Sequence, residues 1–171
     1  DFSVVSVDEL TKNGKYDLVC SSITPAIRGK GALEKMMSIS KKYCFNASFV
    51  HKENDLYNEI LKKVFNKTIE NGYGGHWYSF YAMFNRLFLS GFYPITGYFD
   101  EYKDISEDLS KEGVKKIAAN VISLINNPPE FATQMIEEYI SSEYGGKESI
   151  KTRDMRRYGM ILWDVNNKSA R

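Results

Sequence analysis

The chain has 171 residues, which is enough for one domain with a hydrophobic core. Its formal net charge is +1, so the composition does not indicate the strongly basic surface that nucleic-acid binding requires. No apolar run reaches the length of a membrane-spanning helix and no export signal is evident, so we expect a cytoplasmic protein that has no contact with a membrane.

The two cysteines, Cys20 and Cys44, each fall in a short apolar run that is typical of a buried strand. We therefore expect two reduced core residues rather than a disulfide. Together with the two histidines they lack the spacing of metal ligands, so the sequence predicts no metal site.

In chain order, the first buried strand is expected over residues 16–21. Pro25 and a glycine-containing turn lead to a helix, and a second strand is expected over residues 43–50. This strand–helix–strand unit favours a right-handed parallel crossover. An amphipathic helix near residues 56–65 and an aromatic helix near residues 77–89 follow. A third strand is expected over residues 93–99, then two helices over residues 107–140, and a last strand over residues 158–165.

One segment resembles a known family. Residues 16–26 read Tyr-Asp-Leu-Val-Cys-Ser-Ser-Ile-Thr-Pro-Ala, which is similar to a stretch of class I, Rossmann-like methyltransferases of bacterial type. Four later segments are similar to the same family in the same order: Leu33-Glu34-Lys35-Met36, the aromatic helix containing Asn85, Gly91-Phe92-Tyr93-Pro94, and Leu162-Trp163-Asp164-Val165.

The resemblance implies an α/β fold built as a partial Rossmann-like sheet, with helices on both faces. Residues 16–21, 43–50 and 93–99 would be the family's fourth, fifth and sixth strands, which run parallel. Residues 158–165 would be the seventh, which runs antiparallel between the fifth and sixth. We expect residues 1–171 to form a single domain that corresponds to the C-terminal part of such an enzyme.

The sequence departs from the family in its cofactor-binding part. The family binds S-adenosylmethionine with a glycine-rich loop after its first strand and an acidic residue after its second, and neither is present. Arg28-Gly29-Lys30-Gly31 follows a different strand and is interpreted as a flexible lead-in to a helix. Because the chain also starts at Asp1, inside ordered-looking sequence, we expect a piece of a longer protein. The parent would bind S-adenosylmethionine, and this chain alone would be inactive and bind it weakly at most.

The resemblance also implies where an acceptor would lie. Residues that follow the family's fourth strand lie beside the transferring methyl group, and here the candidates are Ser21, Ser22, Thr24 and Pro25. Their hydroxyls could orient the acceptor or the methionine part of the cofactor. A Ser/Thr-Pro turn that caps the strand is the alternative.

A second set of candidates could line a substrate pocket, namely His76, Trp77, Tyr78, Tyr81 and Asn85. An aromatic stripe at helical spacing is the alternative, because such stripes are usually core. His76 is a candidate general base or a turn residue. No catalytic residue is identified.

Two further functions stay open. A non-catalytic binding or assembly module would use the unpaired strand edge from Tyr16 to Ser21, through which a homodimer could form. A different nucleotide-dependent α/β enzyme is disfavoured, since no P-loop is present. For the methyltransferase, near-neutral charge and an aromatic content of 14% favour a small-molecule acceptor over a nucleic acid.

Overall fold

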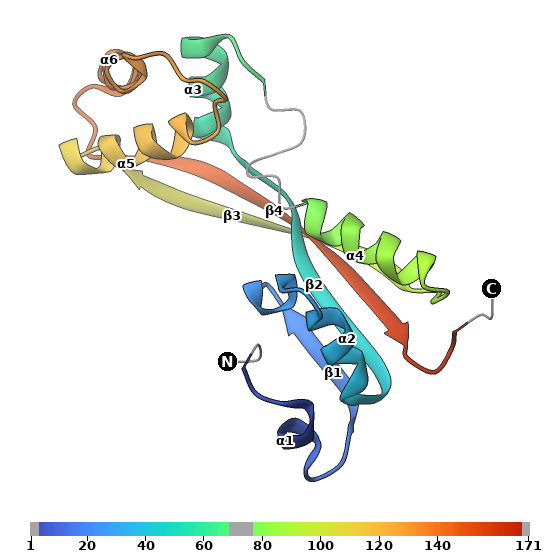
Figure 1. Ribbon diagram of the computed structural model, residues 1–171. Helices are drawn as coiled ribbons and strands as arrows, with labels where there is room; N and C mark the ends of the chain where they lie inside the picture. Colours follow the sequence, from blue (N-terminus) through green and yellow to red (C-terminus); the bar gives the residue numbers. More distant parts are fainter. Residues whose placement is uncertain (1–3, 69–76, 169–171) are drawn as a thin grey trace. The chain divides into compact units, whose positions relative to one another are not determined.

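The computed structural model describes residues 4–68 and 77–168, without the side chains of residues 28, 77 and 78. Within these residues it contains six α-helices, one short 3-10 helix and a four-stranded sheet (Figure 1). The strands are β1 (Tyr16–Ser22), β2 (Ser40–Asn54), β3 (Ile95–Asp108) and β4 (Ser149–Asp164). The helices are α1 (Val7–Thr11), η1 (Pro25–Arg28), α2 (Ala32–Ser38), α3 (Asp55–Phe65), α4 (Trp77–Leu89), α5 (Lys111–Ile122) and α6 (Ala132–Tyr144).

The strand order of the sheet is β1-β2-β4-β3. β1 pairs with β2 in parallel, and the other neighbours are antiparallel. β4 therefore lies between β2 and β3 and runs opposite to both, so β2 and β3 share one direction. The predicted α/β class and the predicted antiparallel last strand are confirmed.

Three strands are longer than the sequence predicted. The expected ranges 43–50, 93–99 and 158–165 correspond to Ser40–Asn54, Ile95–Asp108 and Ser149–Asp164. The added residues are mostly polar, so they carry no apolar pattern. They join the sheet because strand pairing uses backbone groups, which every residue except proline supplies in full. The helix expected from residue 107 starts at Lys111 for the same reason.

The described chain forms two compact units. The first unit takes its described residues from ranges 1–50, 76–99 and 157–171, and the second from ranges 51–75 and 100–156. β2, β3 and β4 each contribute residues to both units. That residues 1–171 fold as a single domain stays a prediction. Among the described helices, none is long and apolar enough to cross a membrane.

In the first unit, α2 and α4 cover the same face of the sheet. Met36 of α2 and Phe80 of α4 belong to one core cluster with Cys44 of β2 and Trp163 of β4. Each of these side chains is at most 2% exposed. Burying large apolar side chains in this way contributes roughly 1.5–3 kcal/mol each. That helices also cover the opposite face stays a prediction.

The two cysteines lie on opposite faces of the sheet. Val19 pairs with Cys44, and the next residue, Cys20, pairs with Phe45. Since successive side chains of a strand point to opposite faces, Cys44 enters the helix-covered core and Cys20 does not. Cys44 is buried and Cys20 is exposed, so the prediction that both are core residues was wrong for Cys20.

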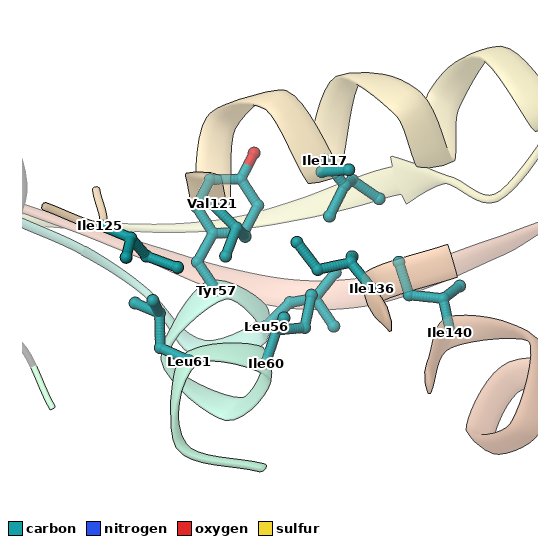
Figure 2. Close-up of a cluster of buried hydrophobic side chains, with 10 residues drawn as sticks. Leu56, Tyr57, Ile60, Leu61, Ile117, Val121, Ile125, Ile136 and Ile140 are labelled. Atoms are coloured by element: carbon teal, nitrogen blue, oxygen red, sulfur yellow. The ribbon is translucent and has the colours of Figure 1, made fainter. Parts of the chain in front are cut away.

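The second unit has its own core between α3, α5 and α6 (Figure 2). Figure 2 shows Ile60 of α3, Ile117 and Val121 of α5, and Ile136 of α6 converging on one another. All four are at most 1% exposed. α3 begins at a cap, because the Asn54 side chain accepts a hydrogen bond from the Tyr57 backbone N–H at 3.1 Å. The apolar stripes that the sequence shows on these helices thus meet in this core.

Candidate functional site

A cavity of about 580 Å³ lies in the first unit, at the carboxyl end of β1. This size is typical of a small-molecule site. From the segment after β1 and from α2 it is lined by Ile23, Thr24, Pro25, Ile27, Gly29 and Leu33. From β2 and α4 it is lined by Ala47, Ser48, Phe49, Ser79, Ala82, Met83 and Arg86.

The chain turns sharply as it leaves β1. Ile23 has a φ of +48°, which a β-branched residue rarely adopts. Its backbone N–H donates to the Ala47 carbonyl at 3.0 Å, which holds this conformation against β2. Backbone strain of this kind costs on the order of 1–3 kcal/mol, and strained residues cluster at active sites and ligand-binding sites. Here it puts Ile23 at the cavity wall.

Thr24 has a structural task at the same turn. Its side-chain oxygen accepts a hydrogen bond from the Ala26 backbone N–H at 3.2 Å and caps η1. Pro25 is at the first position of η1, where its missing N–H has no cost. The capping turn that the sequence offered as an alternative is therefore formed, and Thr24 and Pro25 also line the cavity.

Helix α4 lines the cavity with one face. Ser79, Ala82, Met83 and Arg86 are spaced three or four residues apart, so they lie on the same side of the helix. Among the described lining residues Arg86 is the charged one. Its guanidinium forms an ion pair with the Glu34 carboxylate of α2. The Arg86 and Glu34 side chains are 55% and 51% exposed, so the pair is largely hydrated.

A small polar cluster is buried in the strands beside the cavity. Ser21 of β1 is paired with Asn46 of β2, and in a parallel pair these side chains share a face. The Ser48 hydroxyl, at the cavity, donates to Asn46 Oδ1 at 2.7 Å. The Ser21 hydroxyl is buried and has no hydrogen-bond partner within the described residues. A buried hydroxyl without a hydrogen-bond partner destabilises the fold by on the order of 1–3 kcal/mol. A serine that served only to fill the core would therefore be unfavourable at this position.

The structure gathers some of the predicted site residues and separates others. Thr24 and Pro25 line the cavity, whereas Ser21 and Ser22 lie in β1 outside its lining. Tyr81 and Asn85 are exposed on α4 and do not line it. The Tyr81 ring packs edge-on against Phe80, with 5.2 Å between centroids.

The other three predicted residues lie wholly or partly outside the described part of the chain. His76 lies outside the described residues. Trp77 and Tyr78 begin α4, but their side chains also lie outside the described part. Their expected role in a substrate pocket stays a prediction.

Sequence reasoning did not single out Arg86 or Ser48, which both line the cavity. The signal was present in α4, where residues 79, 82, 83 and 86 repeat at helical spacing beside the buried residues Phe80 and Leu87. The prediction instead followed the aromatic residues and named Tyr81 and Asn85, which lie on another side of α4. Only the packing of α4 on the sheet decides which side meets the cavity.

The cavity favours binding and orientation over acid–base chemistry. Its described lining is hydrocarbon with three hydroxyls and one guanidinium, and it includes no carboxylate, imidazole or thiol. In the described part of the chain no group of three or more metal-ligating side chains occurs. Chemistry that depends on alignment therefore suits the cavity best.

The residues present do not fit S-adenosylmethionine as a whole. Gly29 lines the cavity and Gly31 begins α2 with a φ of +77°, but η1 separates both from β1. The family's loop instead connects its first strand directly to a helix. The arrangement seen is a helix lead-in, as the sequence predicted, so no step of the chemistry is assigned to a cofactor on this chain.

The second unit has a smaller cavity of about 350 Å³ with charges of both signs. Arg153 and Asp104 lie 3.6 Å apart there and are both well exposed. Glu59, also in its lining, accepts hydrogen bonds from two tyrosines of α6. Arg153 and Asp104 are paired with each other and Glu59 is bound to two phenols, which makes this cavity the weaker candidate.

Comparison with models of known protein families gives no match, and no curated protein matches the chain. The function is therefore argued from the sheet and the cavity.

Proposed function

We propose that this chain forms the acceptor-side part of an S-adenosylmethionine-dependent methyltransferase, and that the parent protein methylates a small molecule. The observation that carries the proposal is the strand order β1-β2-β4-β3, with β4 antiparallel between its neighbours. This is the order that the resemblance implies for the family's fourth, fifth, seventh and sixth strands. A cavity at the carboxyl end of β1 supports it, because open α/β sheets bind ligands at that end.

The lining of the cavity suits methyl transfer. The reaction is an in-line displacement at a sulfonium methyl, and alignment of the reactants supplies most of its rate. The strained turn at Ile23 and the capped turn at Thr24 give the cavity a fixed wall beside β1. In this proposal these residues hold the acceptor, while S-adenosylmethionine is bound by another part of the parent protein.

Calorimetry tests the proposal on two proteins. The parent protein should bind S-adenosylmethionine, whereas the 171-residue chain alone should bind it weakly or not at all. Ala82→Trp, which fills the cavity, should leave cofactor binding by the parent intact, since it changes the acceptor side alone. Failure of the parent to bind at millimolar S-adenosylmethionine would exclude the methyltransferase.

A second candidate function is that of a non-catalytic assembly module. β1 ends the strand order, so within the described residues its outer edge has no neighbouring strand. Leu18, at the middle of this edge strand, is 50% exposed. Unpaired apolar edges favour pairing with another chain. A homodimer formed through the edge from Tyr16 to Ser21 is therefore the alternative proposal.

Light scattering of the chain separates the two candidates. The assembly module predicts a dimer that Leu18→Lys converts to a monomer, because a charged side chain protects a strand edge. Val4→Lys is the matched control, since Val4 is 78% exposed and lies outside the strand. A strictly monomeric chain at high concentration would exclude the assembly module.

A further inference from the structure

Arg86 gives the cavity a chemical preference. It is the charged residue among the described lining, and its neighbours on α4 that face the cavity are Ala82 and Met83. Its lining also includes the apolar residues Ile23 and Leu33 and the hydroxyls of Thr24, Ser48 and Ser79. A ligand that fills this space must therefore be largely apolar, and any charge that it carries must be negative to be paired.

The charge of Arg86 limits how much negative charge the ligand can bring. Arg86 carries one positive charge, so once a ligand displaces Glu34 the guanidinium can neutralise one negative charge, and a doubly charged phosphate would keep one charge unpaired. A carboxylate carries one charge, and its two oxygens match the fork of a guanidinium. Arg86 has five N–H donors, and its contact with Glu34 uses one of them.

Displacing Glu34 from its ion pair with Arg86 requires little free energy. Exposed ion pairs of this kind contribute about 0–1 kcal/mol, because water solvates both partners. Glu34 does not line the cavity, whereas Arg86 does. A carboxylate inside the cavity would thus compete with Glu34 for the guanidinium.

We propose that the cavity binds an apolar carboxylic acid, whose carboxylate pairs with Arg86 in competition with Glu34 while its hydrocarbon body contacts Leu33 and Met83. The inference depends on the proposed function, since it names the chemical class of the acceptor in that same cavity. The acceptor atom would then be distant from the carboxylate, toward the turn at Ile23 and Thr24.

Titration of the full chain with phenylbutyrate and phenylbutanamide tests the inference, with binding followed by NMR. The two probes have the same body and differ in charge. The carboxylate should bind about tenfold more tightly than the amide, as a charge-assisted hydrogen bond predicts. Binding of neither probe, or equal binding of both, would overturn the inference.

Substitutions at Arg86 and at Glu34 should change carboxylate binding in opposite directions. Arg86→Gln should abolish the preference for the carboxylate, and Arg86→Lys should restore part of it. Glu34→Gln should tighten carboxylate binding several-fold, because the guanidinium loses its competitor. If the ion pair only holds α2 against α4, Arg86→Gln and Glu34→Gln would instead weaken binding of both probes alike. That result would contradict the proposed competition.

Comparison with cofactor binding separates the two proposals. If the chain prefers the carboxylate but the parent does not bind S-adenosylmethionine, the cavity assignment holds and the methyltransferase does not. If the parent binds S-adenosylmethionine and the chain shows no preference between the probes, only the acceptor class is overturned.

Discussion

The ring of Phe80 in α4 lies directly against the backbone of Gly159 in β4. A Cβ added at Gly159 would overlap this ring, and it would also meet the Val50 side chain at 2.6 Å. Phe80 is 2% exposed, so the ring has little room to move. The absence of a side chain at residue 159 therefore sets how closely α4, and with it Arg86, approaches the sheet.

Gly159→Ala should accordingly lower the free energy of unfolding by about 1–3 kcal/mol, as overpacking of a core does. Urea denaturation followed by circular dichroism measures this. Gly29→Ala is the control, because a Cβ at Gly29 meets nothing within 4 Å. Equal denaturation midpoints for the two variants would contradict the close packing of Phe80 on Gly159.

Ser21 and Ser40 provide a matched pair of buried hydroxyls. The Ser40 hydroxyl donates to the Tyr43 carbonyl at 2.8 Å, whereas that of Ser21 has no partner within the described residues. Removing an unpaired buried hydroxyl is neutral or stabilising, and removing a paired one costs about 1 kcal/mol. Thermal denaturation should therefore show Ser21→Ala at or above the wild type and Ser40→Ala below it. The reverse order would show that Ser21 is hydrogen-bonded.

The two thiols should differ in reactivity. Burial raises the pKa of the Cys44 thiol to about 11, and its Sγ donates to the Met36 carbonyl at 3.6 Å. Cys20 is exposed. A thiol-specific reagent at neutral pH should modify Cys20 quickly and Cys44 only after denaturation, because the thiolate is the reactive form. Cys20→Ser should remove the fast phase, and a fast phase that persists in this variant would contradict the assignment.

Glu59 connects α3 to α6 through two phenols. Tyr139 and Tyr144 donate hydrogen bonds to Glu59 Oε1 at 2.6 and 2.5 Å. Burial, and next the hydrogen bond to Glu59, raise the pKa of Tyr144 to about 12 and that of Tyr139 further above its usual value of 10. Both groups therefore stabilise the fold in full below pH 10 and lose this contribution as the pH rises toward 12 and beyond.

Glu59→Gln removes the charge and should bring both tyrosine pKa values down toward 10, with a loss of stability of about 1 kcal/mol at neutral pH. Phenolate absorbance during an alkaline titration measures the pKa values. Glu138→Gln, which changes an exposed carboxylate on α6 beside Tyr139, should leave the titration unchanged. An unchanged titration in Glu59→Gln would contradict the role of this carboxylate.

Ser110 caps α5 and also contacts Asp108. Its Oγ accepts from the Gly113 backbone N–H at 3.2 Å and donates to Asp108 Oδ2 at 2.7 Å. The second contact lowers the pKa of the Asp108 carboxyl, so its stabilising effect exists above the usual value of 3.8 and is lost as the pH falls through the lowered one. Ser110→Ala should cost about 1 kcal/mol at neutral pH. It should also raise the pKa of Asp108, which NMR can follow.

Ser123→Ala is the control for the cap. The Ser123 hydroxyl donates to the Asn120 carbonyl near the end of α5, and its removal should change the stability by less than about 0.5 kcal/mol. If the two serine variants were equally stable, the cap at Ser110 would contribute nothing to the fold.

The sequence by itself determined which parts of the chain form the sheet and the second unit's core. Apolar runs located every strand, and the stripes on α3, α5 and α6 located the buried residues, because burial of apolar surface selects those patterns. The resemblance added the strand order, which the structure shows. The resemblance also named Thr24 and Pro25, which line the cavity, along with Ser21 and Ser22, which do not.

Only the tertiary structure decided how far the strands extend and which side chains meet the cavity. Residues 100–108 joined β3 through backbone pairing, which leaves no apolar pattern in the sequence. The side of β1 on which Cys20 lies depends on register, because a shift of one residue exchanges the faces. Arg86 rather than Tyr81 faces the cavity because Phe80 packs on Gly159, a contact between residues far apart in the chain.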